Sequence, residues 1–161
     1  MKRILIALAV LLSVQMADAQ TKSPEAARKA VESAKAAAAN PKKAAKVATW
    51  TKLASSYMDA YNAPAGNAWL GASKQELQLI MGNQQPTSVE SVVVGGDQFV
   101  KEVYADKEFY FSPAGQLVMI NITKPVIEDA LGEALEAYKK AFEVDVKKSK
   151  EKDVKDAIAG I

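Results

Sequence analysis

Two amphipathic segments, far apart in the chain, constrain the fold more than any other feature. The first carries apolar residues at Val47, Trp50, Leu53, Ala54, Tyr57 and Tyr61. The second carries them at Ile127, Ala130, Leu131, Ala134, Tyr138, Ala141 and Phe142. Spacings of three and four residues place such a set along one side of an α-helix, and that side needs a partner to be buried. We therefore expect the two segments to close on each other as one antiparallel helical hairpin.

The residues of this hairpin resemble the two helices of a tetratricopeptide repeat. Trp50-x-x-Leu53-Ala54-x-x-Tyr57 resembles the first-helix signature, with Ala54 where glycine is usual, and Ala134-x-x-x-Tyr138-x-x-Ala141 resembles the second. In such a pair, small residues such as Ala54 and Ala134 let the helices approach closely, while aromatic side chains fill the space between them. The signature is a packing rule and carries no chemistry.

The distance between the two signatures predicts an insertion. Ala134 lies 84 positions downstream of Trp50, whereas a whole tetratricopeptide repeat takes about 34 residues. We expect residues from about 63 to 125 to be looped out of the hairpin. Within them, Ser73-Lys74-Gln75-Glu76 has the spacing of a capping box and predicts a short helix that ends at Gly82.

Beyond Pro86 the apolar pattern changes from helical to alternating. The β-rich runs cover 89–94, 99–104, 108–111 and 116–122, with turn sequences at Gly95-Gly96 and at Ser112-Pro113-Ala114-Gly115. Such runs predict a four-stranded antiparallel meander. We expect one face to carry Phe109, Phe111, Leu117 and Met119, or their cross-strand neighbours, against a helix. The other face is expected to hold Tyr104, Tyr110, Val118 and Ile120. The predicted fold class is α+β, mainly α, with the small helix and the meander interrupting the hairpin.

Further helices are expected on either side of the insertion. Ser23-Pro24-Glu25 starts an alanine-rich helix, which is either a partial half-repeat packed on the hairpin or a frayed arm. The two hairpin helices are expected from about Pro41 to Tyr61 and from about Val126 to Val146. A last helix begins near Lys150 and has an apolar side, so we interpret 147–161 as the start of a truncated further repeat, with the natural chain continuing past Ile161.

The start of the chain predicts a secretory signal peptide. Met1-Lys2-Arg3 is followed by an apolar run of 11 residues and then by Ala17-Asp18-Ala19. That run is shorter than the ~20 residues needed to span a bilayer. We expect cleavage after Ala19, no integral membrane span in the mature chain, and one domain over residues 20–161. Because no cysteine follows the apolar run, lipidation of the bacterial lipoprotein kind is excluded, and the predicted location is periplasmic or secreted.

The amino-acid composition excludes most kinds of metal site and catalytic site. The chain has no histidine and no cysteine, so soft-ligand metal sites and nearly every nucleophile–base pair are ruled out. Carboxylates at Asp97, Glu102, Asp106 and Glu108 have the spacing of exposed strand and turn positions rather than of an acid–base pair. We predict no catalytic, metal or cofactor site. A formal net charge of +2 argues against a nucleic-acid partner.

A second resemblance covers most of the chain after residue 19. The runs Lys74-Gln75-Glu76-Leu77 and Tyr110-Phe111-Ser112-Pro113-Ala114-Gly115-Gln116-Leu117 are similar to the N-terminal region of secreted tetratricopeptide-repeat proteins of Bacteroidetes-type bacteria. The resemblance implies a periplasmic or outer-membrane-associated scaffold whose partner is a protein or peptide.

Two further interpretations remain open beside the scaffold. Trp69, Tyr104 and Tyr110 could form an aromatic platform on the inserted sheet for a carbohydrate or cell-wall fragment. This alternative requires the three rings to be accessible on one face. The other interpretation is an enzyme whose active part lies beyond Ile161.

Overall fold

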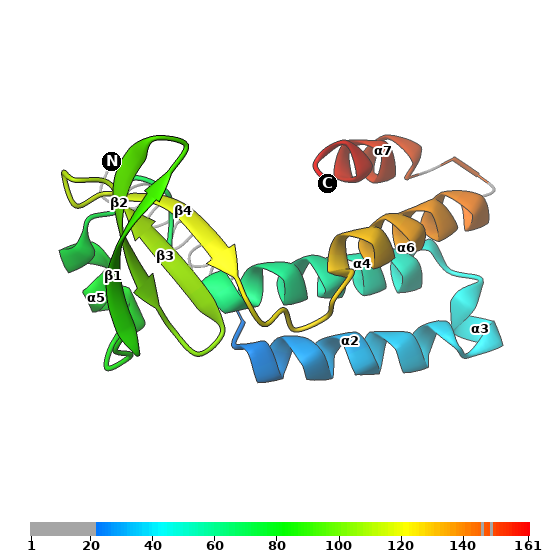
Figure 1. Cartoon of the computed structure of the whole chain (residues 1–161). Coiled ribbons are helices and arrows are strands. Elements are labelled where there is room, and N and C mark those ends of the chain that lie inside the picture. The colour runs from blue at the N-terminus through cyan, green and yellow to red at the C-terminus, as the bar shows by residue number, and fades with distance from the viewer. Residues whose placement is uncertain (1–21, 146, 149) are drawn as a thin grey trace, which may run out of the picture.

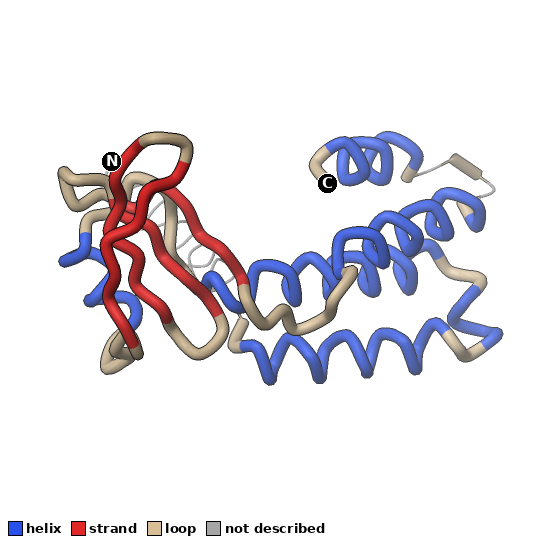
Figure 2. Tube along the Cα trace, viewed as in Figure 1, coloured by secondary structure: helices blue, strands red, loops and turns tan. Residues whose placement is uncertain are grey.

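The computed structural model describes residues 22–145, 147–148 and 150–161, and the predicted signal peptide lies outside them. The helices are α2 (Pro24–Ala38), α3 (Pro41–Ala44), α4 (Val47–Asn62), the 3₁₀ helix η1 (Ala63–Ala65), α5 (Lys74–Met81), α6 (Ala130–Val144) and α7 (Glu151–Ala159). The strands are β1 (Ser88–Val94), β2 (Asp97–Val103), β3 (Lys107–Phe111) and β4 (Leu117–Ile122). The predicted α+β fold with a majority of helix is confirmed, and the strands gather on one side of the molecule (Figure 2).

The two distant amphipathic segments form α4 and α6, which lie side by side and run in opposite directions (Figure 1). They share one hydrophobic cluster, which we call the helical core. Its buried members include Leu53, Ala54 and Tyr57 from α4 together with Ala134 and Ala137 from α6. Ala54 and Ala134 are fully inaccessible, as expected where two helices approach closely.

The aromatic residues of the predicted signature meet at this hairpin. Trp50 and Tyr138 are partly buried and pack against the same helical core. The hydroxyl of Tyr57 donates a hydrogen bond of 3.1 Å to the carboxylate of Glu133 in the first turn of α6. Burial, together with this bond, raises the pKa of Tyr57 to about 12. The hairpin predicted from the apolar periodicity is therefore confirmed.

Helix α2 packs along the other side of α4 (Figure 1). Its alanine-rich stripe buries Ala27, Val31 and Ala34 in the helical core, each at most 3% exposed. Ser23 caps its N-terminus by accepting a hydrogen bond from the backbone N–H of Ala26. Of the two interpretations of this segment, the frayed arm is wrong, because α2 packs on the hairpin.

The prediction of a single helix from Pro41 to Tyr61 is wrong in one respect, because the structure has two helices there, α3 and α4. The indole N–H of Trp50 donates a 2.7 Å hydrogen bond to the carbonyl of Ala44, at the end of α3. That bond satisfies a terminal carbonyl that a continuous helix would have used internally. Lys46 then takes an extended backbone conformation, and α4 begins at Val47.

The second hairpin helix also begins later than predicted, at Ala130 instead of Val126. The side chain of Asp129 accepts a hydrogen bond of 3.2 Å from the backbone N–H of Gly132 and caps the helix there. Val126 stays in the loop and contributes to the helical core from it. An apolar residue at the right spacing was thus buried without being helical.

The insertion forms a separate unit at one end of the hairpin (Figure 1). Ser73 and Glu76 make the predicted reciprocal capping box, which starts α5. The four strands follow in the order β1-β2-β3-β4 with antiparallel neighbours, so the predicted meander is confirmed. One face of the sheet buries Phe109, Phe111 and Leu117 with Ala72 and Leu77, a cluster that we call the sheet core.

A β-bulge changes which residues face the sheet core. Phe111 pairs with Leu117 while Tyr110 pairs with Met119, so Val118 is the extra residue on β4. The bulge reverses the alternation after it. Met119 therefore lies on the open face and Ile120 packs against the sheet core, the opposite of what strict alternation predicted for both.

Candidate functional site

A groove of about 500 Å³ lies between the helices α4, α6 and α7, and we call it the α7 groove. Its lining residues are Val47, Ala48, Thr51, Tyr138, Lys150, Asp153, Val154 and Ala157. None of them belongs to the insertion. The sheet therefore leaves this side of the hairpin open, which the scaffold interpretation requires.

Apolar and polar contacts with α6 hold helix α7 in place. Val154 is 1% exposed, and α7 packs on α6. Asp145, at the end of α6, accepts a 2.6 Å hydrogen bond from the backbone N–H of Lys150 just before α7. The α7 groove therefore depends on the packing of α7 against α6.

The walls of the α7 groove are apolar or small. Ala48 and Thr51 come from α4, Tyr138 from α6, and Ala157 from α7. Among the described residues that line the groove, only Lys150 and Asp153 are charged, and they form an ion pair of 3.2 Å, so this lining has no net charge. Such a surface favours an apolar occupant that can come close to the helix backbones.

The residues of the predicted repeat signature mostly hold the hairpin together. Leu53, Ala54, Tyr57, Ala134 and Ala141 are all buried. Trp50 is half-buried, and its indole N–H donates a hydrogen bond to the carbonyl of Ala44. Of the signature residues, only Tyr138 also lines the groove. Sequence reasoning missed Val47, Thr51 and Ala157 as groove residues, because their common surface depends on where α7 packs. The one available signal was the apolar side of the last helix.

The predicted aromatic platform of Trp69, Tyr104 and Tyr110 does not form. Tyr104 lies on the sheet-core face, with its ring 5.3 Å from that of Phe109, and its hydroxyl donates to Glu102. Burial and that hydrogen bond raise the pKa of Tyr104. Tyr110, paired with Met119, points to the opposite face, and Trp69 is 47% exposed in the loop before α5. The prediction that Tyr104 and Tyr110 share a face is therefore wrong, because the β2–β3 register pairs Tyr110 with Lys101 and so puts odd-numbered residues of β2 beside even-numbered residues of β3.

Tyr104 instead borders a small hollow beneath α5. The hollow measures about 120 Å³ and is also lined by Lys74, Glu102 and Phe111. Lys74 forms a 2.7 Å ion pair with Glu102, and its ammonium group lies 4.7 Å from the centre of the Phe111 ring. Because these polar groups already satisfy one another, the hollow is explained as part of the packing between α5 and the sheet.

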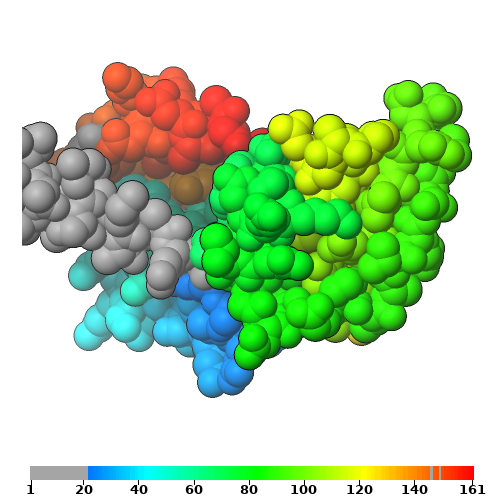
Figure 3. All heavy atoms as spheres, turned by 90° about the vertical axis from the view of Figure 1, so that its left-hand side faces the viewer, coloured from blue at the N-terminus to red at the C-terminus, as the bar shows by residue number. Residues whose placement is uncertain are grey.

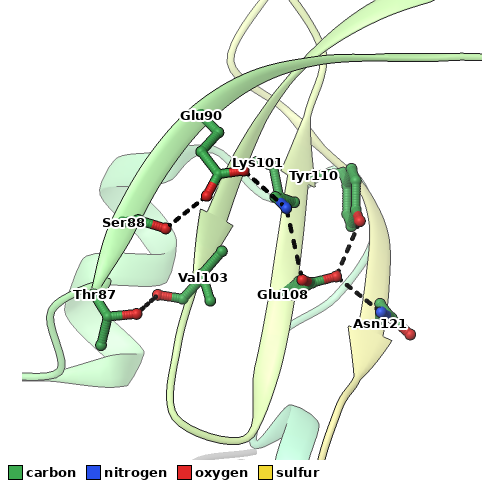
Figure 4. A network of polar contacts seen from close by, with 8 residues as sticks. All are labelled: Thr87, Ser88, Glu90, Lys101, Val103, Glu108, Tyr110 and Asn121. Atoms are coloured by element: carbon green, nitrogen blue, oxygen red, sulfur yellow. Dashed lines mark hydrogen bonds and ion pairs between the residues drawn. The ribbon is translucent and has the colours of Figure 1, made fainter.

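The open face of the sheet carries a polar network that crosses all four strands (Figure 4). Lys101 on β2 lies 2.9 Å from Glu90 on β1 and 3.8 Å from Glu108 on β3. Glu108 also accepts hydrogen bonds from Tyr110 and from Asn121 on β4. The bonds from Lys101 and Ser88 lower the pKa of Glu90, and those from Asn121 and Tyr110 lower the pKa of Glu108. The network fixes strand register and leaves no carboxylate poised for proton transfer.

This network predicts that the free energy of unfolding decreases as the pH is lowered. A carboxylate whose pKa is lowered by folding stabilises the folded state above its ordinary pKa, and the contribution disappears as the pH falls through the lowered value. We expect the free energy of unfolding, measured in urea from about pH 7 to pH 3, to fall less steeply in Lys101→Met than in the wild type, because Glu90 loses its main partner. Lys152→Met, an exposed substitution in α7, is the matched control. Identical pH profiles for wild type and Lys101→Met would contradict the role of the network.

The described residues hold neither a metal cluster nor a membrane-spanning helix. Within 22–145, 147–148 and 150–161, no three potential metal ligands lie close enough together to hold an ion. No helix among these residues is both long and apolar enough to cross a membrane. Comparison with known proteins found no matching family model, no matching curated protein and no matching solved structure. The α7 groove is therefore the candidate that the geometry itself favours.

Proposed function

We propose that this protein is a non-enzymatic scaffold of the bacterial cell envelope that binds a partner protein through the α7 groove. The observation that carries the proposal is an open, apolar groove built on three helices, with its two charges paired to each other. The resemblance of the hairpin to a tetratricopeptide repeat supports it, because such hairpins serve as interaction modules. The predicted signal peptide supports a location in the periplasm or outside the cell.

The form of the groove favours a helical segment of the partner. Small side chains at Ala48 and Ala157 leave room for a helix to lie close to α4 and α7. An amphipathic helix presents apolar residues at intervals of three and four, which can fill such a groove while its polar side stays in water. A highly charged segment is disfavoured, since the groove offers no unpaired charge to receive it.

Selection from a displayed peptide library tests this proposal. We expect the selected peptides to share apolar residues at i, i+3 or i+4 and to become helical on binding. Ala157→Arg or Thr51→Arg places a long charged side chain in the groove and is expected to weaken their binding at least about tenfold. Ala36→Arg, the same kind of change at an exposed position on α2, is the control and is expected to leave binding unchanged.

Circular dichroism of each variant distinguishes a blocked groove from a lost fold. The proposal is overturned if the selection yields no common apolar spacing. It is equally overturned if folded Ala157→Arg and Thr51→Arg bind the selected peptides as tightly as the wild type does.

A further inference from the structure

Strand β1 forms an open edge of the sheet along its whole length. It pairs with β2 over all seven residues from Ser88 to Val94. In the part of the chain that the structure describes, no strand or loop pairs with its other edge. The space-filling view shows the β-hairpin at one side of the molecule, away from α2 and α7 (Figure 3). A row of backbone N–H and C=O groups is thus available to another strand.

The opposite edge of the sheet is covered where β4 begins. The backbone N–H of Gly71 donates a 2.7 Å hydrogen bond to the carbonyl of Leu117, and the N–H of Leu117 donates to the carbonyl of Ala72 at 2.8 Å. Ser73 and Gln116 form a further bridge. The segment before α5 therefore occupies part of this edge. The contrast identifies β1 as the freely accessible edge.

The side chains of β1 give this edge little protection. Edge strands commonly carry charged residues, a proline or a bulge that prevents pairing with another molecule. β1 has one charged residue, Glu90, which is paired with Lys101, and it has no proline, no lysine and a continuous register with β2. Val89 and Val93, on the same face as the sheet core, are 58% and 65% exposed. Two exposed valines on an open edge are a surface that pairing with another strand would bury.

We propose that β1 pairs with β1 of a second copy of this chain, in antiparallel orientation, to form a continuous eight-stranded sheet. Pairing of the strand with itself about its midpoint, Ser91, brings valines together on one face and sets no like charges opposite each other. With Ser91 opposite the partner's Ser91, all seven residues of each strand are paired. Val89 then lies opposite the partner's Val93 on one face, and Glu90 opposite the partner's Val92 on the other.

Charge selects this register over its neighbour. A shift of one residue would place side chains of opposite faces against each other, so only shifts by two preserve the two-fold symmetry. The shift toward the N-terminal half brings Glu90 opposite the partner's Glu90, which like-charge repulsion disfavours, and the shift toward the C-terminal half leaves only residues 90–94 of the strand paired. In the proposed register each Glu90 faces the partner's Val92 and keeps its own Lys101 at 2.9 Å. The pairing therefore leaves the polar network intact.

Sedimentation of the purified protein over a range of concentrations tests the proposal. We expect a monomer–dimer equilibrium, and we expect Ser91→Lys to weaken dimerisation at least about tenfold, because it puts two like charges opposite each other at the axis. Ser55→Lys makes the same change at an exposed position on α4 and is expected to have no effect. A wild-type protein that remains monomeric up to about 1 mM would overturn the proposal, as would an unchanged Ser91→Lys dimer.

Cysteine cross-linking then tests the register, since the chain has no cysteine of its own. Directly opposed residues of an antiparallel pair are close enough for a disulfide. We expect Ser91→Cys to cross-link with itself under mild oxidation, and Val89→Cys to cross-link with Val93→Cys in a mixture but not with itself. A dimer in which Ser55→Cys cross-links as readily as Ser91→Cys would use another surface and would overturn the proposal.

Discussion

Tyr57→Ala is expected to lower the free energy of unfolding by about 3–5 kcal/mol. Tyr57 is 2% exposed and is among the largest fully buried side chains in the described part of the chain. Its loss leaves a cavity in the helical core and also removes the hydrogen bond to Glu133 on α6. Because a domain of this size is stable by only about 5–15 kcal/mol, the variant should unfold at a much lower urea concentration.

Two tyrosine variants serve as controls for this result. Tyr61→Ala changes the same residue type one turn further along α4, where the side chain is 51% exposed, and should cost about 0.5 kcal/mol or less. Tyr57→Phe keeps the ring and should cost only about 0.5–1.5 kcal/mol for the lost hydrogen bond. Equal effects of Tyr57→Ala and Tyr61→Ala would contradict the position of Tyr57 in the core.

Phe109→Ala is expected to have a similarly large effect on the insertion, about 3–5 kcal/mol. Phe109 is fully inaccessible, and its ring lies 5.3 Å from that of Tyr104 and 6.4 Å from that of Phe111. Removing it takes the central ring from the sheet core. The measurement is again urea unfolding, followed by circular dichroism of the β-sheet signal.

Tyr110→Ala is the matched control, because Tyr110 is the next residue on β3 and points to the opposite face. Its ring is half-buried, and its hydroxyl contributes one hydrogen bond to Glu108. We expect it to cost about 1 kcal/mol. The assignment of the two faces fails if Tyr110→Ala destabilises the protein more than Phe109→Ala does.

The hairpin and the insertion were predictable because their signals are local. Periodicity identified the two helices that form the helical core, even at 84 positions apart. The Ser73–Glu76 capping box and the glycine pair at 95–96 marked the start of a helix and the tip of a β-hairpin, and both lie where expected. Each of these signals depends only on residues within one turn or one element.

The features that escaped prediction depend on contacts between elements. The break at Ala45 and Lys46 follows from a bond between the Trp50 indole and the Ala44 carbonyl, which no propensity encodes. The bulge at Val118 places Met119 and Ile120 on the faces opposite to those predicted, because a strictly alternating pattern in the sequence does not reveal an extra residue in the strand. The α7 groove also depends on a contact between elements and was missed, since it exists only after α7 has packed on α6.

The closure of α4 and α6 into one hairpin around the inserted unit underlies both the fold and the proposed binding groove, and nuclear Overhauser spectroscopy tests it most directly. The hydroxyl of Tyr57 lies 3.1 Å from the Glu133 carboxylate, across 76 positions of sequence. We predict cross peaks between the ring protons of Tyr57 and the side-chain methylene protons of Glu133. Cross peaks from Tyr57 that reach only α2 and its own helix would contradict the account.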